Sequence, residues 1–541
     1  MNKSFLSMMP KTGLAGLKEN WLSDLTSGFL VFLIALPLCL GIAVASGFPP
    51  SAGIITAIIG GVLVSRISGS FLTINGPAAG LIVVLLAAVQ ALGDGDAIAG
   101  YRYTLAAIVV ASVLQILMGR FKLGQLSSFF PASVIHGMMA AIGIIIIATQ
   151  THVMLGVTPV SGSLFSIIVQ IPHSLPVMNL DCVLISFLGL LILIIWPLSG
   201  SKIPAPVIVI LMGIVFAWHF GFQEAATSGS HYLVTIPDNF MAGFYFPDFS
   251  KITTMAFWEA VLSISLVGSL ESLLSATAVD KLDPYKRTSD LDRDLTAIGI
   301  GNLVAGMIGG LPMIAEIVRS SANINNGAKT AWANFFHGLI LLLFVVFFTG
   351  FIQRIPLAAL AALLVYTGYR LASPKTFTQA LDVGKEQLLL FVVTLIGILA
   401  TDLLLGVILG IVVKLAITLA RGVWLGNLFK IHFTIQQPDN NTRVIKLLGS
   451  ALFSNILPLK QTLAGLEQGK TLIFDFSDGY LIDHTVMTFI HDFQQNYEAQ
   501  GGHCRQVGSA LETFSDHALA ARLMTADDRV DVKGERAKSQ D

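Results

Sequence analysis

Two side chains about halfway along the chain could bind a cation. Glu271 and Ser275 stand four residues apart in an apolar run, so both would face the same side of a helix. A carboxylate and a hydroxyl on one face can supply oxygen ligands to Na⁺ or carry a proton, and ionisable residues within membrane spans are commonly functional. The alternative is a structural hydrogen bond to a neighbouring helix.

Arg319 and Glu316 form a second candidate pair. Arg319 would place a full positive charge inside an apolar segment, where it could attract an anion. Glu316 lies three residues earlier, so the two could instead make a structural ion pair on one helix face. A carboxylate next to an anion site repels the ligand unless it is protonated, bonded to Arg319 or part of cation coupling.

The other polar residues within apolar segments give weaker evidence of a function. His136 is as readily a packing residue as a proton relay, and we expect Asp402 and Lys414 to be structural or interfacial. Cys39 and Cys182 are typical of small apolar packing positions. The three cysteines lie far apart and show no metal-ligand spacing, so neither a zinc site nor a disulfide framework is indicated.

Two segments, residues 69–80 and 309–321, share an unusual pattern. Each opens with glycine and a short extended apolar stretch, and each carries a proline (Pro77, Pro312) near where a helix could begin. The pattern predicts a strand-like stretch followed by a half-helix that starts deep in the membrane, although kinked helices are the alternative. Two facing helix N-termini present unpaired N–H groups, which favour an anion.

The composition requires a membrane setting for these segments. Of 541 residues, 54% are apolar and 12% are charged, about half the charge of a soluble domain. The formal net charge of −1 leaves no basic surplus for nucleic acid. These values exclude a soluble enzyme, a disordered chain and a nucleic-acid binder, and they indicate a polytopic protein of the lipid bilayer.

Fourteen apolar stretches fall into two groups of seven, separated by the polar residues 222–254. The two unusual segments are third in each group, and an odd number of spans per group makes the two halves inverted. The lysines and arginines orient both termini to the cytoplasm of a cell membrane. The stretches are 25–46, 51–67, 72–91, 102–119, 127–149, 181–198, 203–221, 255–279, 294–309, 313–326, 331–350, 355–372, 386–400 and 402–424.

Charged residues become frequent after residue 426, which predicts a soluble C-terminal domain. Residues 443–447 and 471–476 read as strands, a helical pattern follows residue 483, and residues 504–507 read as a weaker strand. This alternation predicts a small α/β domain in which Asp475 and Asp483 shape strand ends. The last residues, 526–541, show no apolar periodicity and are expected to be disordered.

The order and spacing of several motifs resemble the SulP family of sulfate permeases and anion exchangers. The motifs are residues 34–38, 75–77, 131–137, 271–275 and 310–330, and the C-terminal domain resembles the STAS domain of that family. The resemblance implies an all-α membrane domain of fourteen segments in a seven-plus-seven inverted repeat with two half-helices. It further implies an elevator-like motion of a core (segments 1–4 and 8–11) against a gate (segments 5–7 and 12–14), and a homodimer.

The same resemblance assigns the site and the domains. The anion would be bicarbonate or sulfate, with Na⁺ or H⁺ as coupling ion at Glu271 and Ser275 and no other cofactor. The domains would be 1–24 (N-terminus), 25–426 (transport), 427–525 (STAS-like, shortened) and 526–541 (tail). Residues assigned to the anion are Asn75, Gly76, Pro77, Ala78, Ala79, Ala315, Glu316, Ile317 and Arg319.

Glu316 departs from the small or hydroxylated residue that many family members have at this position. The sequence around residues 312–319 looks like a bacterial branch often linked to carbonic anhydrase, which slightly favours bicarbonate.

Other functions remain open alternatives. The same fold could act as an uncoupled exchanger or channel, or as a membrane anion sensor that signals through the STAS-like domain. A nucleobase permease is disfavoured because Arg319 and two helix N-termini suit a small oxyanion better than a neutral ring. An enzyme is the least favoured reading, because the sequence contains no P-loop, Rossmann fingerprint or nucleophile–base pattern.

Overall fold

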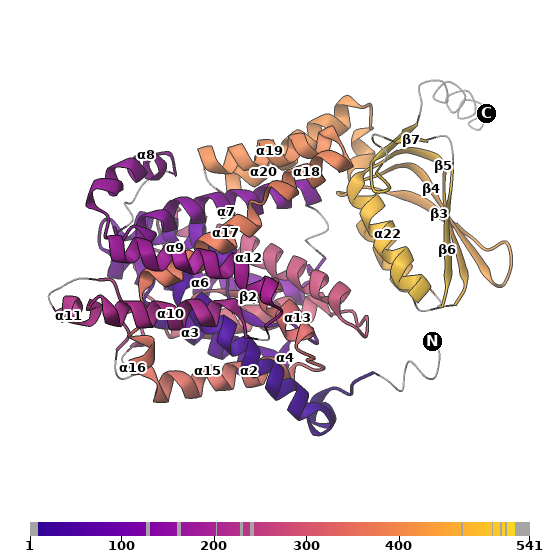
Figure 1. The fold of residues 1–541 in the computed structure, drawn as a ribbon. Helices are drawn as coiled ribbons and strands as arrows, with labels where there is room; N and C mark the ends of the chain where they lie inside the picture. Colours follow the sequence, from indigo (N-terminus) through magenta and orange to yellow (C-terminus); the bar gives the residue numbers. More distant parts are fainter. Residues whose placement is uncertain are drawn as a thin grey trace. The chain divides into compact units, whose positions relative to one another are not determined.

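The computed structural model divides the chain into two compact units. The large unit contains Pro10–Gly124 and Met139–Ala372, and the small unit contains Met1–Met9, Gln125–Met138 and Ser373–Asp541 (Figure 1). Each unit is described by itself. The structure describes residues 9–125, 130–158, 164–201, 203–227, 231–237, 243–401, 403–466, 469–499, 501–508, 511–513, 515 and 517–524.

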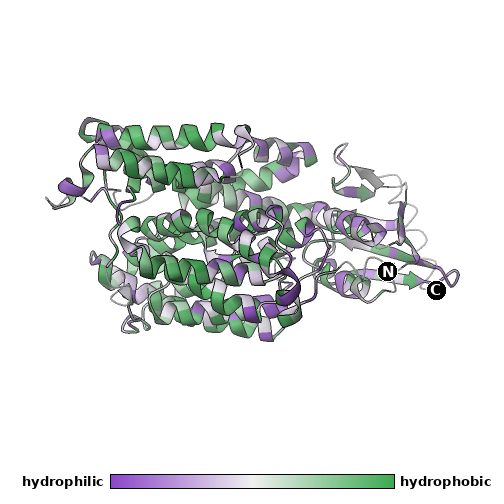
Figure 2. Cartoon of the chain, turned by 60° about the horizontal axis from the view of Figure 1, so that its bottom comes forward, coloured by the Kyte–Doolittle hydropathy of each residue, from purple (hydrophilic) through white to green (hydrophobic). Residues whose placement is uncertain are grey.

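The large unit is built of helices, and most of them are strongly apolar (Figure 2). Its helices are α2 (Gly13–Ala45), α3 (Pro50–Ile59), η1 (Gly60–Val64), α4 (Ser65–Ile67), η2 (Ala79–Leu81), α5 (Ile82–Gly93), α6 (Ala97–Arg120), most of α7 (Ala132–Met154), α8 (Leu164–Ser174), η4 (Leu175–Val177), α9 (Leu180–Ile195), η5 (Trp196–Ser199), α10 (Ala205–His219), α11 (Phe222–Thr227), α12 (Met255–Leu282), α13 (Leu291–Met307), α14 (Ile317–Asn325), α15 (Trp332–Phe347), α16 (Thr349–Ile352) and α17 (Leu357–Leu371).

Every apolar stretch predicted from the sequence contains a helix. Within the described part of the chain, eight helices are long and apolar enough to cross a membrane, and four apolar helices are shorter. The number of crossings therefore stays a prediction, as does the depth at which α5 and α14 begin. Helix α8, which lies between the predicted fifth and sixth stretches, was not expected.

Close backbone contacts between small residues bring α15 near the centre of the large unit. A Cβ on Gly61 of η1 would lie 2.5 Å from the Cα of Gly338 in α15, so neither position has room for a side chain. Such small-residue contacts are a usual way for membrane helices to approach closely. The contact places the first half of α15, which carries Asn334 and His337, beside η1.

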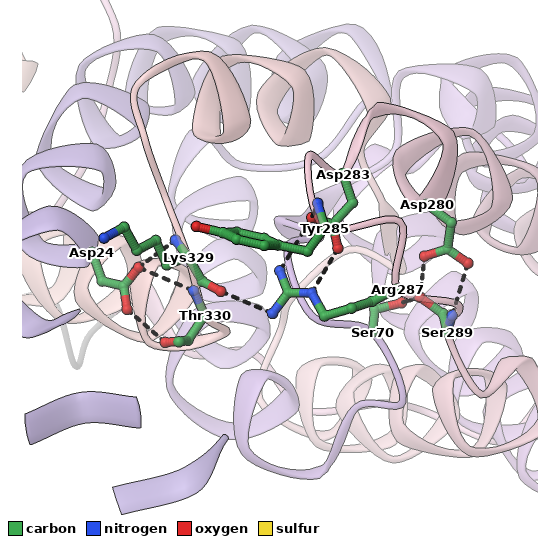
Figure 3. Close-up of polar contacts among 9 residues, drawn as sticks. All are labelled: Asp24, Ser70, Asp280, Asp283, Tyr285, Arg287, Ser289, Lys329 and Thr330. Atoms are coloured by element: carbon green, nitrogen blue, oxygen red, sulfur yellow. Dashed lines mark hydrogen bonds and ion pairs between the residues drawn. The ribbon is translucent and has the colours of Figure 1, made fainter. Parts of the chain in front are cut away.

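A row of polar contacts connects the ends of several helices in this unit (Figure 3). Asp24 of α2 accepts hydrogen bonds from Lys329 N–H and Thr330 N–H, at 2.8 and 3.1 Å. Arg287 pairs with Asp283, with 2.7 Å between Nε and Oδ2, and donates to the Lys329 carbonyl at 3.0 Å. The Ser289 hydroxyl donates to Asp280 at 2.6 Å. These contacts join the starts of α2 and α15 to the loop between α12 and α13.

The small unit begins with the helices α18 (Pro374–Val383), α19 (Lys385–Ala400) and α20 (Leu403–Ala420), followed by η7 (Leu425–Leu428). Lys414 of α20 lies 2.6 Å from Glu386, and Arg421 pairs with the other oxygen of that carboxylate. Lys414 is therefore a structural residue, as expected. Asp402 and the tail from residue 526 lie outside the described residues.

A six-stranded sheet forms the rest of the small unit. The strands are β3 (His432–Gln436), β4 (Thr442–Ala451), β5 (Thr471–Ile482), β6 (His503–Val507), β7 (Leu511–Thr513) and β8 (Arg522–Met524), with the helices α21 (Leu457–Ala464) and α22 (His484–Ala499). Strands β4, β5 and β6 are parallel neighbours, whereas β3, β7 and β8 pair antiparallel.

The sheet confirms the predicted strands at residues 443–447, 471–476 and 504–507. Apolar side chains of β4, β5 and α22, including Ile445, Phe474 and Ile490, form its core. Asp483 caps α22 by accepting from Val486 N–H at 2.9 Å and also accepts from Phe453 N–H at 2.6 Å. Asp475 accepts from Ser477 N–H at 2.9 Å but lies within β5, which continues to Ile482. The prediction that a strand ends at Asp475 was therefore wrong, whereas Asp483 directly follows the end of β5 as expected.

Candidate anion-binding site

Two three-residue strands lie at the centre of the candidate site. Strand β1 (Asn75–Pro77) pairs antiparallel with β2 (Met313–Ala315), so that Asn75 is opposite Ala315 and Pro77 is opposite Met313. A helix follows each strand: η2 and α5 after β1, and α14 after β2. Because the strands are antiparallel, the two helices begin at opposite ends of this short ladder.

Polar side chains on neighbouring helices hold the ladder in place. Asn302 of α13 accepts from Met313 N–H at 2.6 Å and donates to the Met313 carbonyl at 3.2 Å. Ser272 of α12 accepts from Ala315 N–H at 3.1 Å. Ser320 of α14 accepts from Ile74 N–H at 2.8 Å, just before β1. Several backbone groups of the two segments thus have buried side-chain partners, as irregular backbone inside a membrane protein requires.

Glu271 lies against the start of the helix that follows β1. Its side chain is 5% exposed, and a Cβ on Gly80 in η2 would collide with both carboxylate oxygens. Among the described residues, its Oε2 has no hydrogen-bond partner. Ser275 is one turn further along α12 and 9% exposed. A buried acceptor without a partner fits a proton or a small cation, so these two residues could hold either.

Glu316 reaches the same helix start from the other strand. It is the N-terminal cap residue of α14, with extended backbone (φ −94°, ψ 112°). Its carboxylate lies near Ala79 N–H and within electrostatic reach of Arg319 and Glu271. Its Oε1 atom is buried and finds no partner in the described part of the chain. Two carboxylates therefore converge on the N-terminus of η2.

Arg319 is the largest fully buried side chain among the described residues, with 0% exposure. Its Nε, Nη1 and Nη2 atoms have no hydrogen-bond partner among the residues that the structure describes. A Cβ on Gly76 would collide with Nη1, so the guanidinium lies directly against β1. A buried, unpaired charge is strongly unfavourable, so the donors of this guanidinium are candidates to bind an anion.

The alternative of a structural Glu316–Arg319 ion pair is not supported. No ion pair joins these two described residues, and the guanidinium nitrogens lack partners. The reason is local geometry: Glu316 precedes the first helical residue, so the rule that residues three apart share a helix face does not apply to it. Its side chain instead turns toward Ala79.

Three further buried polar residues surround the guanidinium. Asn334 donates to the Asn75 side-chain oxygen at 2.9 Å, while Asn75 Nδ2 and Asn334 Oδ1 have no partners among the described residues. His337, one turn along α15, is 0% exposed, and within the described chain both of its ring nitrogens also lack partners. The thiol of Cys39 in α2, expected only to pack, lies close enough to Arg319 to interact with the guanidinium, without a contact that meets the geometry of a hydrogen bond.

The structure brings most of the predicted site residues together. Glu271, Glu316, Arg319 and the segment Asn75–Ala79 meet around the ladder, with Ala78 at 1% and Ala315 at 0% exposure. Ile317 is the first residue of α14, and its side chain is 38% exposed. Its backbone rather than its side chain therefore belongs to the candidate site. His136 belongs to the small unit. In the described residues, no three His, Cys, Asp or Glu side chains form a metal-binding group.

The sequence analysis missed Asn334, His337 and Gly80. Asn334 and His337 are three residues apart in an apolar aromatic run, and two polar residues on one face of such a helix are a usable signal. Gly80 belongs to the recognised segment, but only the fold reveals that its missing side chain makes room for Glu271.

The sequence model of the "Sulfate permease family" matches residues 21–394. The chain belongs to the sulfate permease family. This family consists of anion transporters, and the assignment together with the apolar helices makes the chain a multi-pass membrane protein.

Individual relatives agree with the family assignment. YvdB of Bacillus subtilis, named as a candidate sulfate transporter, is 28% identical over 505 residues, which cover 91% of this chain and 92% of YvdB. The bicarbonate transporter BicA of a Picosynechococcus strain is 26% identical over 79% of this chain and 75% of BicA.

Solved structures support the fold. The transmembrane domain of a cyanobacterial BicA matches with a TM-score of 0.62 at 22% identity, over 72% of this chain and 97% of that domain. SLC26A9 matches with a TM-score of 0.67 at 15% identity, over 93% of this chain and 86% of that protein. The latter alignment extends over most of the chain, and the strand-containing C-terminal domain is compatible with a STAS domain.

Proposed function

We propose that this protein is a secondary active transporter of a small inorganic oxyanion, coupled to Na⁺ or H⁺. The observation that carries the proposal is Arg319, which is fully buried, has no partner among the described residues and lies against β1. Burial without a partner is costly for a cation, so an arginine retained at such a place is suited to an anion that arrives from outside. The relatives named for sulfate or bicarbonate transport favour these two anions.

Charge balance favours bicarbonate over sulfate. Arg319 supplies one positive charge, while Glu271 and Glu316 bring two ionisable carboxyl groups to the same site. Each uncompensated charge in a buried site is unfavourable, so a monoanion is easier to hold there than a dianion. One coupling cation or proton at Glu271 and Ser275 would offset one of the carboxylates.

The proposal includes the remaining family features. The two strands with their helices would move as part of a core against a gate, in an elevator-like cycle. The protein would act as a homodimer in the cell membrane with both termini in the cytoplasm, and the C-terminal domain would regulate it. An uncoupled exchanger of the same fold would differ from this coupled transporter in one property: its anion transport would not depend on any cation gradient.

Uptake into proteoliposomes tests the proposal. Labelled bicarbonate and sulfate are offered with and without inward Na⁺ and pH gradients to the wild type, Arg319→Met and a control, Arg354→Met, whose arginine is exposed. We expect gradient-driven accumulation in the wild type and the control, and none in Arg319→Met. Binding of an anion without flux in the wild type would instead favour the sensor.

Glu271→Gln separates coupled transport from exchange. If Glu271 carries the coupling ion, the variant loses its response to the cation gradient while anion exchange persists. Uptake by the wild type that ignores both gradients would establish the uncoupled exchanger.

A further inference from the structure

Two asparagines beside β1 use only part of their hydrogen-bonding capacity. Asn334 of α15 donates to the Asn75 side-chain oxygen at 2.9 Å and to the Gly60 carbonyl at 3.4 Å. Both asparagine side chains are buried, with 0% exposure for Asn75 and 1% for Asn334. Asn334 Oδ1 and Asn75 Nδ2 have no partner among the described residues. The pair therefore leaves one acceptor and one donor group unused in a place buried from solvent, where an unpaired polar group is unfavourable.

The Gly60 carbonyl decides which end of the Asn334 amide is left unused. The amide nitrogen donates to two oxygens, and the opposite orientation would place the Asn334 oxygen against the Gly60 oxygen, acceptor against acceptor. The surrounding backbone holds this arrangement, because a Cβ on Gly60 would lie 2.6 Å from the Asn75 carbonyl oxygen and Gly61 lies equally close to Gly338. The unused acceptor is therefore Asn334 Oδ1, on closely packed elements.

We propose that this pair selects oxyanions that carry an O–H group, with Asn334 Oδ1 as the acceptor of that group. This inference rests on the proposed function and specifies the substrate class of its site. Bicarbonate and dihydrogen phosphate carry an O–H group as well as charged oxygens, whereas sulfate, nitrate and acetate at neutral pH offer only acceptor oxygens. An anion of the first class can bond to donors and to an acceptor at once, and an anion of the second class cannot.

Arg319 reaches the same strand at the neighbouring residue. A Cβ on Gly76, which directly follows Asn75 in β1, would collide with Arg319 Nη1. The guanidinium and Asn75 Nδ2 are unused donors for the charged oxygens of an anion, and Asn334 Oδ1 is an unused acceptor for its O–H group. An anion without an O–H group would leave Asn334 Oδ1 buried without a partner, which costs the desolvation of that atom. A site that bonds to a substrate hydroxyl in this way rejects analogues that lack it.

Other acceptors near the site can change their role, whereas an amide oxygen cannot. His337 lies one turn beyond Asn334 and is 0% exposed, and its ring nitrogens lack partners within the described chain. Either nitrogen can carry the proton, so His337 can present a donor to any anion and does not require an O–H group. The carboxyl groups of Glu271 and Glu316 likewise accept when ionised and donate when protonated. Selection is therefore assigned to Asn334.

Acetate is the matched analogue of bicarbonate, because a methyl group replaces the O–H group on the same carboxylate. Labelled bicarbonate bound to the purified full-length protein at pH 8 with Na⁺ present is displaced by unlabelled bicarbonate, acetate or nitrate, and labelled sulfate is bound in parallel. The variants are Asn334→Leu, Asn334→Ala and His337→Phe, with Asn325→Leu, an exposed asparagine of α14, as the control. We expect the wild type to bind acetate about tenfold to a hundredfold more weakly than bicarbonate, the effect of one buried acceptor left unpaired.

The ratio of the two dissociation constants is decisive, because a general weakening of the site cancels in it. Loss of most of the bicarbonate preference in both Asn334 variants, with the preference kept in His337→Phe and Asn325→Leu, supports the selection. A preference that persists in the Asn334 variants, or that disappears only in His337→Phe, overturns it. If neither Asn334 variant folds, wild-type binding of acetate or nitrate as tight as that of bicarbonate overturns it equally.

Two further outcomes separate this inference from the proposed function. A wild type that binds sulfate but not bicarbonate overturns the selection of an O–H group and leaves oxyanion transport in place. A wild type that binds neither anion contradicts the proposed function itself.

Discussion

Two buried arginines of the large unit have opposite surroundings. Arg287 pairs with Asp283 through two nitrogens and donates to the Lys329 carbonyl (Figure 3). Its guanidinium also lies over the Phe71 ring, 4.7 Å from the ring centre. Arg319 has none of these contacts within the described chain, although it is the more deeply buried, at 0% against 8% exposure.

The difference separates a structural role from a binding role. A buried charge is tolerated when it is paired and hydrogen-bonded, and Arg287 meets both conditions. It joins the loop after α12 to the start of α15, and so helps to fix the elements around the ladder. Arg319 meets neither condition, so its guanidinium is available to a ligand.

The largest expected effect comes from removing the unpaired arginine. Arg319→Met should reduce uptake of the transported anion about a hundredfold or more, since a charged partner in a buried site contributes several kcal/mol. Its unfolding temperature should stay the same or rise, because a buried unpaired charge has been replaced by an apolar chain. Uptake assays and thermal unfolding of the purified protein measure both effects. Retained uptake, or a large loss of stability, would remove the contrast with Arg287.

The opposite pattern is expected at the paired arginine. Arg287→Met leaves Asp283 buried and unpaired, which should lower the free energy of unfolding by about 3–5 kcal/mol. The anion affinity of the protein that remains folded should not change. Adding Asp283→Leu to this variant removes the stranded charge and should recover much of the stability. Chemical unfolding of the single and double variants tests this, and equal stability of both would contradict the assigned role.

Two glycines sharpen the comparison within the site itself. An added Cβ at Gly76 would displace the Arg319 guanidinium, and one at Gly80 would displace the Glu271 carboxylate. Gly76→Ala should therefore weaken anion binding by about tenfold, or ~1.4 kcal/mol. Gly80→Ala should chiefly alter the dependence on the coupling cation. Gly350→Ala is the control, because no atom lies within 4 Å of the added Cβ. Identical effects of the two site variants on anion and cation dependence would show that the two groups do not act separately.

The smallest expected effect concerns a partly buried histidine of the small unit. Burial lowers the pKa of His484 below its ordinary value, while its Nδ1 lies 2.6 Å from the Leu519 carbonyl. Below pH ~6.5 the unfolded chain therefore binds more protons than the folded one, so stability falls as the pH decreases. The protection of β5 and α22 against hydrogen exchange in the full-length protein, measured relative to the intrinsic exchange rate at each pH, should fall between pH 7.5 and 5.5, and less so in His484→Asn. An unchanged pH response in the variant would assign the effect to another group.

The sequence anticipated the helices and the central charges better than their contacts. Apolar length located every stretch, and glycine and proline marked the two segments that carry β1 and β2. The direction of Glu316 could not be read in this way, because it depends on where α14 begins, and one residue decides whether its side chain follows the helix face. The position of Asn334 and His337 beside η1 depends on the contact between Gly61 and Gly338. These two glycines are far apart in the chain, so the sequence alone does not reveal the contact.

The ladder between β1 and β2 also bears on how such a site can evolve. Its two strands are joined through main-chain groups, which every residue type except proline provides in full. Side chains on either segment can therefore be exchanged while the joint between the two halves is kept. One segment here carries only uncharged residues from Phe71 to Gly80, and the other carries Glu316 and Arg319. A scaffold of this kind allows a lineage to change which ion it selects by single substitutions in one half, without rebuilding the centre of the molecule.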